Sequence, residues 1–183
     1  INSNCTVRSN SSVINVHKER NIKSEIVTQL LYGDTFKKIK KNGTWIKIKN
    51  DTDNYKGYIK NKNFQPNQKN THKVCNLSAA LYSKPHSKYK IKNKLSFESK
   101  IKVLEKKSDF YKFDNLWIKK KDLKKINVTT KDPFHNIKKF VNVKYKWGAK
   151  HYSGIDCSGL IQLFFNYNNK FCPRDAKDQI KYF

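Results

Sequence analysis

Two stretches of this chain repeat the same pattern of apolar residues, and this repeat limits the folds that the chain can adopt. The segment LLYGDTFKKIKKNGTWIKI, which begins at Leu30, aligns without a gap on LSFESKIKVLEKKSDFYKF, which begins at Leu95. Farther along, GYI of the first stretch matches LWI of the second after a shorter loop. The apolar residues that coincide are Leu30 and Leu95, Tyr32 and Phe97, Phe36 and Ile101, Trp45 and Phe110, and Ile48 and Phe113.

Each copy contains short runs of alternating apolar and polar residues, separated by turn residues such as Asn42 and Gly43. This alternation is typical of strands that bury one face. The repeat therefore predicts two small all-β barrels of about five strands each. We expect Trp45 and Trp117 to pack in the barrel cores, with ligand stacking as the alternative.

The first copy resembles a bacterial SH3-like domain through its strands Gly-Asp-Thr-Phe, Trp-Ile-Lys-Ile and Gly-Tyr-Ile. The second copy resembles a degenerate member of the same family, so the resemblance covers about residues 7–126. This places a first SH3-like domain at residues 1–68 and a second at residues 69–127.

The sequence changes character after the repeat. Residues 128–133 have the composition of a linker, with Asp132 as a helix N-cap and Pro133 at the first helical position. Apolar residues then follow helical spacing from Phe134 to Val141. We therefore expect a helix here, at the start of a separate domain over residues 134–183.

The abundance of lysine bears on the choice of partner. The formal net charge is +26, yet only Arg8, Arg20 and Arg174 of the 40 basic residues are arginine. Recognition of phosphates and base edges favours the guanidinium group, so lysine in nearly every segment indicates a compositional bias rather than a nucleic-acid site. We expect no specific nucleic-acid partner, although the lysines attract acidic ligands.

The remaining composition argues against several other classes of protein. No apolar run approaches the roughly 20 residues that span a bilayer, so we expect no membrane insertion. Cys5, Cys75, Cys157 and Cys172 lack the paired spacing of a zinc site, and we expect no metal and no other cofactor. Unpaired cysteines and the absence of a visible signal peptide favour the cytoplasm; the alternative is a periplasmic or secreted protein whose signal preceded Ile1.

The stretch YKWGAKHYSGIDCSGLIQ, residues 145–162, stands out from the lysine-rich background. From Cys157 onward the apolar residues fall on one face of a helix, which puts Cys157 in the first turn. Unpaired backbone N–H groups and the helix dipole favour an anion there and make a thiol a better nucleophile. On position alone, a buried cysteine on the core face of the helix is an equal alternative.

Three motifs surround this cysteine: Tyr145-x-Trp147-Gly148, GIDCSGL at residues 154–160, and Pro173-Arg174-Asp175-Ala176 with Gln179. Together they resemble the N-terminal half of NlpC-type cysteine peptidases, papain-like enzymes that cut peptidoglycan stem peptides. With two SH3-like domains they further resemble γ-D-glutamyl-L-diamino acid endopeptidases, which trim wall peptides that have a free N-terminal L-alanine. The expected fold is multidomain: two small all-β SH3-like barrels, then the N-terminal, helical part of an α+β papain-like domain.

The resemblance implies roles for the residues that match. Cys157 attacks the amide carbon between γ-D-Glu and the diamino acid, and forms an acyl-enzyme that water hydrolyses. Tyr145 and the backbone N–H of Cys157 hold the oxyanion. Asp156 pairs with the free amine of L-alanine, and Ser158 contacts the D-Glu carboxylate.

Three further residues complete the implied site. Arg174 supports it, and the alternative is a structural ion pair of Arg174 with a residue such as Asp175. From the first SH3-like domain, the resemblance implies an acidic residue and a tyrosine that close the pocket around the amine, and we assign these to Glu25 and Tyr55.

Two features depart from the family's pattern. Gly148-Ala149 stands where the family has Gly-Gly, a change that costs little. More important, all five histidines precede Cys157, whereas the family supplies its base from strands after the nucleophile. His151 is near Cys157 in sequence, but a loop residue before a helix need not point at the sulfur, and a surface or substrate-side role is the alternative.

These departures predict a fragment that is inactive alone and poorly folded beyond about residue 130, because the face of Phe164 and Phe165 would have no sheet to pack on. The leading hypothesis is a monomeric peptidase of murein peptide recycling, acting on peptidoglycan stem peptides with a free N-terminal L-Ala. Three others stay open: a non-catalytic cell-wall-binding SH3-like module with a vestigial peptidase segment, a nucleic-acid binder driven by charge, and a papain-like site with another amide or acyl-transfer substrate.

Overall fold

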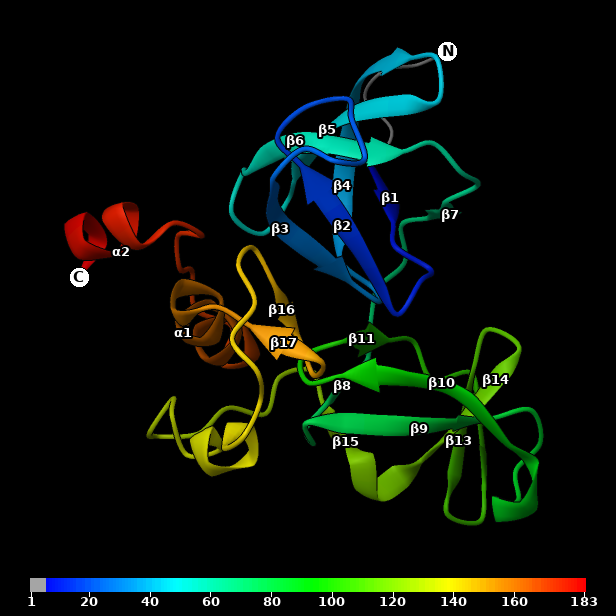
Figure 1. Ribbon diagram of the computed structural model, residues 1–183. Coiled ribbons are helices and arrows are strands. Elements are labelled where there is room, and N and C mark those ends of the chain that lie inside the picture. The colour runs from blue at the N-terminus through cyan, green and yellow to red at the C-terminus, as the bar shows by residue number, and fades with distance from the viewer. Residues whose placement is uncertain (1–5) are drawn as a thin grey trace.

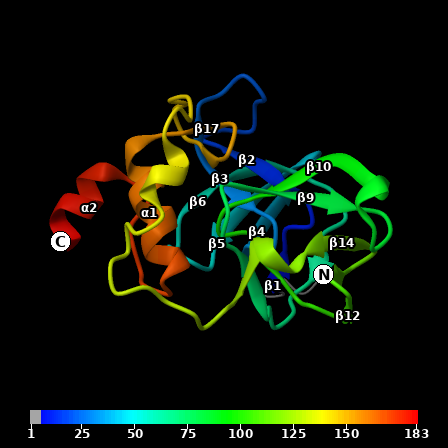
Figure 2. The same ribbon diagram turned by 90° about the horizontal axis from the view of Figure 1, so that it is seen from below.

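The computed structural model describes residues 6–183, most of whose regular structure is β-strand. Within this range the α-helices are α1 (Cys157–Tyr167) and α2 (Ala176–Tyr182). Figure 1 shows a first sheet at the top, a second group of strands at lower right, and the C-terminal segment at the left of both. Seen from below in Figure 2, the helices again lie to one side of the strands. The fold is therefore mainly β with a helical C-terminal segment.

The first part is an antiparallel sheet of seven strands in the order β3-β2-β6-β5-β4-β1-β7. Its alternating residues bury a core around Leu30, Phe36 and Ile59. Trp45 is also buried, which agrees with its interpretation as a core residue. The strands are β1 (Thr6–Arg8), β2 (Val13–His17), β3 (Ile26–Leu31), β4 (Thr35–Asn42), β5 (Trp45–Asn50), β6 (Lys56–Lys60) and β7 (Gln65–Pro66).

The second part consists of a five-stranded sheet, β10-β9-β14-β13-β12, and a three-stranded sheet, β11-β8-β15. They enclose a core around Leu81, Phe113 and Ile118, and Trp117 is buried beside them. The elements are β8 (His72–Val74), β9 (Ser78–Tyr82), the 3-10 turn η1 (Ser87–Tyr89), β10 (Lys90–Ser96), β11 (Lys100–Ile101), β12 (Glu105–Lys107), β13 (Phe110–Phe113), β14 (Leu116–Lys119), the 3-10 turn η2 (Lys120–Asp122) and β15 (Leu123–Lys125).

Neither part closes into a hydrogen-bonded barrel among residues 6–183, which differs from the expected pair of barrels. The first sheet ends at β3 and β7, and the second part divides into two sheets. The periodicity of a strand predicts which face is buried but not which edges pair, so it could not distinguish open sheets from closed ones.

The two parts meet at turns that follow equivalent strands of the repeat. Gly33 has a φ of 85°, and a Cβ on it would lie 2.0 Å from the carbonyl oxygen of Lys100. The Lys100 backbone N–H donates to the carbonyl of Tyr32 at 2.8 Å, so the chains approach as closely as glycine permits. Nearby, Arg8 pairs with Asp114, which also accepts from the Tyr32 hydroxyl.

The C-terminal segment begins differently from the expectation. In place of a helix from Phe134 there is only the 3-10 turn η3 (Ile137–Phe140). Val141 is extended and Asn142 has a φ of 68°, so the backbone cannot continue as a helix. Asp132 still accepts from the Phe134 backbone N–H, but it caps an isolated turn. The short hairpin β16 (Lys150–His151) and β17 (Gly154–Ile155) then leads into α1.

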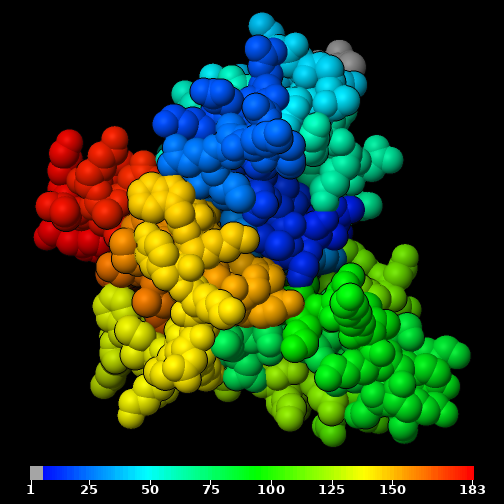
Figure 3. All heavy atoms as spheres, viewed as in Figure 1, coloured from blue at the N-terminus to red at the C-terminus, as the bar shows by residue number. Residues whose placement is uncertain are grey.

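The expectation that the face of Phe164 and Phe165 lacks packing partners is wrong for Phe164. Its side chain is fully buried against Phe97, which also contacts Phe140 and Tyr167. Phe97 belongs to the second part, so the repeat itself supplies the surface on which α1 packs. In Figure 3 the yellow and orange atoms of the C-terminal segment accordingly lie against both the blue first sheet and the green second part.

Phe97→Ala should therefore lower the free energy of unfolding by about 3–5 kcal/mol, because it opens a cavity among three aromatic rings. Leu104→Ala, at an exposed site of the same part, serves as the control and should change it by less than about 0.5 kcal/mol. Urea denaturation followed by tryptophan fluorescence measures both. Equal, small effects of the two substitutions would contradict the packing of α1 on Phe97.

Candidate active site

A pocket of about 570 Å³ lies between the first sheet and the C-terminal segment. The first sheet contributes the loop before β3 and the loop before β6, while the C-terminal segment contributes the start of α1 and the loop before α2. Every candidate site residue from the sequence lines this pocket: Glu25, Tyr55, Tyr145, Asp156, Cys157, Ser158 and Arg174. The structure thus brings together residues that are more than a hundred positions apart in the chain.

Cys157 is the first residue of α1, and its side chain is exposed. Asp156 caps the helix: its Oδ1 accepts from the backbone N–H of Gly159 at 2.7 Å, as is usual for an aspartate N-cap. The other carboxylate oxygen accepts from the Gly148 N–H at 2.8 Å. This pair of hydrogen bonds fixes the turn before α1. Because Cys157 is exposed, the alternative that it is a buried core residue does not apply.

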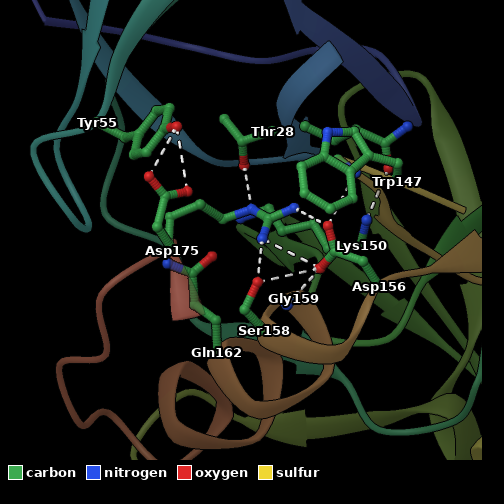
Figure 4. Close-up of polar contacts among 12 residues, drawn as sticks. Thr28, Tyr55, Trp147, Lys150, Asp156, Ser158, Gly159, Gln162 and Asp175 are labelled. Carbon is green, nitrogen blue, oxygen red and sulfur yellow. Dashed lines mark hydrogen bonds and ion pairs between the residues drawn. The ribbon is translucent and has the colours of Figure 1, made fainter. Parts of the chain in front are cut away.

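Arg174 holds the same turn against the first sheet through hydrogen bonds to Asp156, Ser158 and Thr28. Figure 4 labels these three partners, with Thr28 facing Asp156 and Ser158. Its guanidinium group is buried and bonds Asp156 through both terminal nitrogens, at 3.1 Å and 2.6 Å. It also donates to Ser158 Oγ at 2.8 Å and, through Nε, to Thr28 Oγ1 on β3 at 3.0 Å. Arg174 therefore makes the structural ion pair foreseen as an alternative, but with Asp156 and not with Asp175.

Asp175 instead accepts from the Tyr55 hydroxyl, 3.2 Å from both carboxylate oxygens. Burial and the nearby charge of Asp175 raise the pKa of Tyr55 to about 12. The Tyr55 phenol therefore stays protonated at neutral pH and joins the first sheet to the start of α2.

Glu25 is held at the rim of the pocket by two donors. Its carboxylate accepts from Trp147 Nε1 at 2.8 Å and from Lys18 Nζ at 3.1 Å. These hydrogen bonds, that of Trp147 foremost, lower the pKa of Glu25.

Gly148, the residue after Trp147, has a φ of 71°, and a Cβ there would lie 1.9 Å from the Ile26 carbonyl oxygen. Glycine is therefore required for this loop to rest on β3.

Several residues that line the pocket, or that bond a lining residue from behind it, were not among the candidates from the sequence. Trp147 stood in the quoted motif, and its indole N–H beside Glu25 gives it a role that the motif alone did not assign. Thr28 carries no local signal, because only the fold brings it to Arg174. Lys18, Lys56 and Lys177 also line the pocket, and in a chain so rich in lysine they could not be singled out.

Among the residues that the structure describes, no histidine lines this pocket. His151 is buried in the β16–β17 hairpin, where its Nδ1 lies 2.8 Å from Ser153 Oγ and its ring is against Tyr152. Burial, with a smaller contribution from Lys146, lowers the pKa of His151 to about 4. His151 is therefore a neutral hairpin residue and not the base for Cys157.

Among residues 6–183, no group of three or more histidine, cysteine, aspartate or glutamate side chains is placed to hold a metal ion. In the same part of the chain, no helix is both long and apolar enough to cross a membrane.

Arg174→Met should lower the free energy of unfolding by about 3–5 kcal/mol, because it leaves the buried Asp156 carboxylate unpaired. Adding Asp156→Asn to this variant should recover part of the loss, because the unpaired charge is removed. Arg20→Met, at an exposed loop position, is the control, with an effect within about 0.5 kcal/mol. Chemical denaturation of the four proteins measures these differences. If Arg174→Met costs no more than Arg20→Met, the ion pair does not hold the turn.

The low pKa of His151 predicts a pH dependence of stability. Since its pKa falls from about 6.5 in the unfolded chain to about 4 in the fold, the unfolded state binds more protons between these values. Stability from this group is therefore complete above pH 6.5 and is lost as the pH falls toward 4. The advantage of the wild type over His151→Gln in free energy of unfolding should shrink by about 3 kcal/mol from pH 7 to pH 4. A constant difference across this range would contradict the buried, neutral state.

Comparison with known proteins agrees with the two kinds of domain that the sequence resembles. The model of the bacterial SH3 domain matches residues 11–65, and that of the NlpC/P60 family matches residues 142–183. No curated protein matches the chain.

Among solved structures, an NlpC/P60 family protein from Bacillus cereus matches with a TM-score of 0.82 over 96% of this chain and 76% of that one, at 17% identity. At this identity the likeness concerns the fold. NlpC2 and NlpC1 from Trichomonas vaginalis cover 98% of this chain and 72% and 68% of their own, at 17% and 16% identity, but with TM-scores of only 0.37 and 0.35. In sequence, the chain is thus similar to a bacterial SH3 domain over residues 11–65 and to the NlpC/P60 family over residues 142–183, and its fold is similar to that of an NlpC/P60 family protein.

Proposed function

We propose that this chain carries the nucleophile and the substrate-binding side of a cell-wall cysteine peptidase that hydrolyses the bond between γ-D-Glu and a diamino acid. One observation carries the proposal: an exposed cysteine at a helix start shares a pocket with Glu25 and Tyr55 of the first sheet. The match of residues 142–183 to the NlpC/P60 family supports the general chemistry. The proposed setting is murein peptide recycling in the cytoplasm.

In the proposed reaction, the Cys157 sulfur attacks the amide carbon and forms a thioester, while the amine of the diamino acid leaves with a proton. Water then hydrolyses the thioester. The backbone N–H of Cys157, at the start of α1, and the hydroxyl of Tyr145 are the donors proposed for the oxyanion. Tyr145 is largely exposed at the pocket and so is free to move toward the substrate.

The amine of L-alanine is proposed to bind beside Glu25, near the Tyr55 hydroxyl. Asp156 is the weaker candidate for this contact, because its two oxygens already accept from Gly148, Gly159, Ser158 and Arg174. A carboxylate offers about four acceptor sites, and these donors occupy them. We therefore propose that Asp156 positions Cys157. Ser158, whose Oγ accepts from Arg174, meets the D-Glu carboxylate once its hydroxyl hydrogen turns from Asp156 Oδ1, 3.4 Å away, to the substrate.

Turnover needs a group that takes the proton of the thiol. The carboxylates of the pocket are engaged with hydrogen-bond donors, and no histidine is found among the lining residues within 6–183. We propose that this polypeptide by itself binds the peptide and presents the thiol but does not complete catalytic cycles.

We also propose that the second part is a divergent SH3-like domain. In the first sheet Trp45 pairs with Lys60 across β5 and β6, and in the second part Phe110 pairs with Lys119 across β13 and β14. Trp45 and Phe110 occupy the same position of the sequence repeat. The strand register therefore repeats with the sequence, even though the sheets are connected differently.

The amine subsite predicts that L-Ala-γ-D-Glu-diaminopimelate binds to the chain and that its N-acetylated form binds at least about tenfold more weakly, because the acetyl group removes the charge facing Glu25. Glu25→Gln should weaken binding of the free tripeptide by a similar factor and leave the affinity for the acetylated tripeptide unchanged. Glu105→Gln, on exposed β12, is the matched control. Isothermal titration calorimetry of the three proteins with both peptides measures these affinities. Equal affinity for both peptides would rule out an amine subsite at Glu25.

The nucleophile assignment predicts that iodoacetamide alkylates Cys157 before the buried Cys75 and Cys172. The tripeptide should protect Cys157 from alkylation, because it covers the pocket. Peptide mapping by mass spectrometry follows each thiol separately. Release of diaminopimelate by this polypeptide would contradict the proposed lack of turnover, and slow labelling of Cys157 that the tripeptide does not change would contradict the nucleophile.

A further inference from the structure

A second hollow, here named the basic groove, lies on the second part and has a volume of about 780 Å³. Phe110 and Leu123 line it and are buried, and a run of lysines from the end of β14 through η2 to β15 surrounds them. The basic groove shares no lining residue with the pocket of Cys157. Its lysines are Lys119, Lys120, Lys121, Lys124 and Lys125.

The local fold gathers these lysines on one side. They belong to the sequence KKKDLKK, in which Asp122 is the only acidic residue. Asp122 is buried and accepts from the Asn76 side-chain N–H at 2.8 Å, so its carboxylate is engaged away from the lysines. The turn η2 then brings the lysines on either side of Asp122 to the same hollow.

The charge of the basic groove is largely uncompensated. None of the ion pairs described within residues 6–183 involves its five lysines. In the described part of the chain, Asp109 is the one residue with a carboxylate that lines the groove. At the edge of the groove, burial lowers the pKa of His72, and the charges of Lys106 and Lys125 lower it further. A concave surface with charges of one sign concentrates counter-ions more strongly than a flat one.

We propose that the basic groove binds a flexible, linear polyanion with closely spaced phosphate or carboxylate groups. Lysine ammonium groups are point charges without the planar fork of arginine, so they favour charge density over one fixed geometry. The Phe110 ring is 7% exposed, and the half-buried Tyr111 packs against His72 and has Lys106 Nζ over its ring, so neither aromatic side chain offers a free face on which a nucleobase could stack. The groove is therefore suited to the charge of a polymer and not to its bases, and this binding is independent of the chemistry at Cys157.

The abundance of lysine supplies a control for this proposal. Lys37, Lys40 and Lys41 belong to the equally dense run KKIKK, but they lie exposed on strand β4, away from the groove. The variants K120Q/K121Q/K124Q and K37Q/K40Q/K41Q thus lose the same charge. Their binding to fluorescently labelled polyphosphate, poly-L-glutamate and duplex DNA can be compared by anisotropy at one fixed, low salt concentration, after circular dichroism has established that each variant is folded.

The groove variant should bind polyphosphate or poly-L-glutamate roughly tenfold more weakly than the wild type, while the β4 variant should change by less than about twofold. Preference for one polymer identifies phosphate or carboxylate as the group bound. Asp109→Asn, which removes the opposing charge, should tighten binding about twofold. Equal losses in the two triple variants, or no binding of either polymer, would overturn the proposal. The proposal would also be overturned if the wild type bound duplex DNA more tightly than either polymer and only the groove variant lost this DNA binding. The groove would then be a nucleic-acid site.

Discussion

The buried contact between Arg174 and Asp156 is the interaction on which the candidate site depends. Arg174 precedes α2, Asp156 precedes α1, and the same guanidinium reaches Thr28 on β3. Three segments that share no local sequence signal are therefore held by one side chain. A buried ion pair contributes little net stability compared with apolar packing, yet breaking it leaves a charge without solvent or partner. Its effect is to make one arrangement of the Cys157 turn much more favourable than the alternatives.

The pocket is electrically unlike the rest of the surface. The chain carries a net charge of +26. In the pocket, by contrast, positive and negative side chains are nearly balanced, because three carboxylates line it together with Lys18, Lys56, Lys177 and Arg174. Each carboxylate already has a donor: Asp156 has Arg174, Glu25 has Trp147 and Lys18, and Asp175 has Tyr55. Fixed donors of this kind hold the side chains in place before a ligand arrives, which reduces the cost of ordering them on binding.

The sequence was sufficient for what depends on local pattern and spacing. Alternation identified the strands, helical spacing placed Cys157 at the start of α1, and the motifs named residues that line one pocket. It was not sufficient for contacts between distant segments, such as Arg174 with Asp156 or Phe97 with Phe164. Nor did local pattern determine whether sheets close, or whether the segment at Phe134 makes more than a turn, because tertiary contacts override propensity there.

The repeat explains how one fold supplies two different interfaces. Tyr32 and Phe97 occupy equivalent positions, yet the Tyr32 hydroxyl bonds Asp114 of the second part, whereas Phe97 packs on Tyr167 and Phe164. The next residues, Gly33 and Glu98, both have positive φ, at 85° and 74°. Gly33 permits close approach of the Lys100 backbone, while the buried Glu98 pairs with the Lys100 side chain. The same turn therefore occurs in both copies, and the residues that differ within it make one copy the contact between the sheets and the other the support for α1.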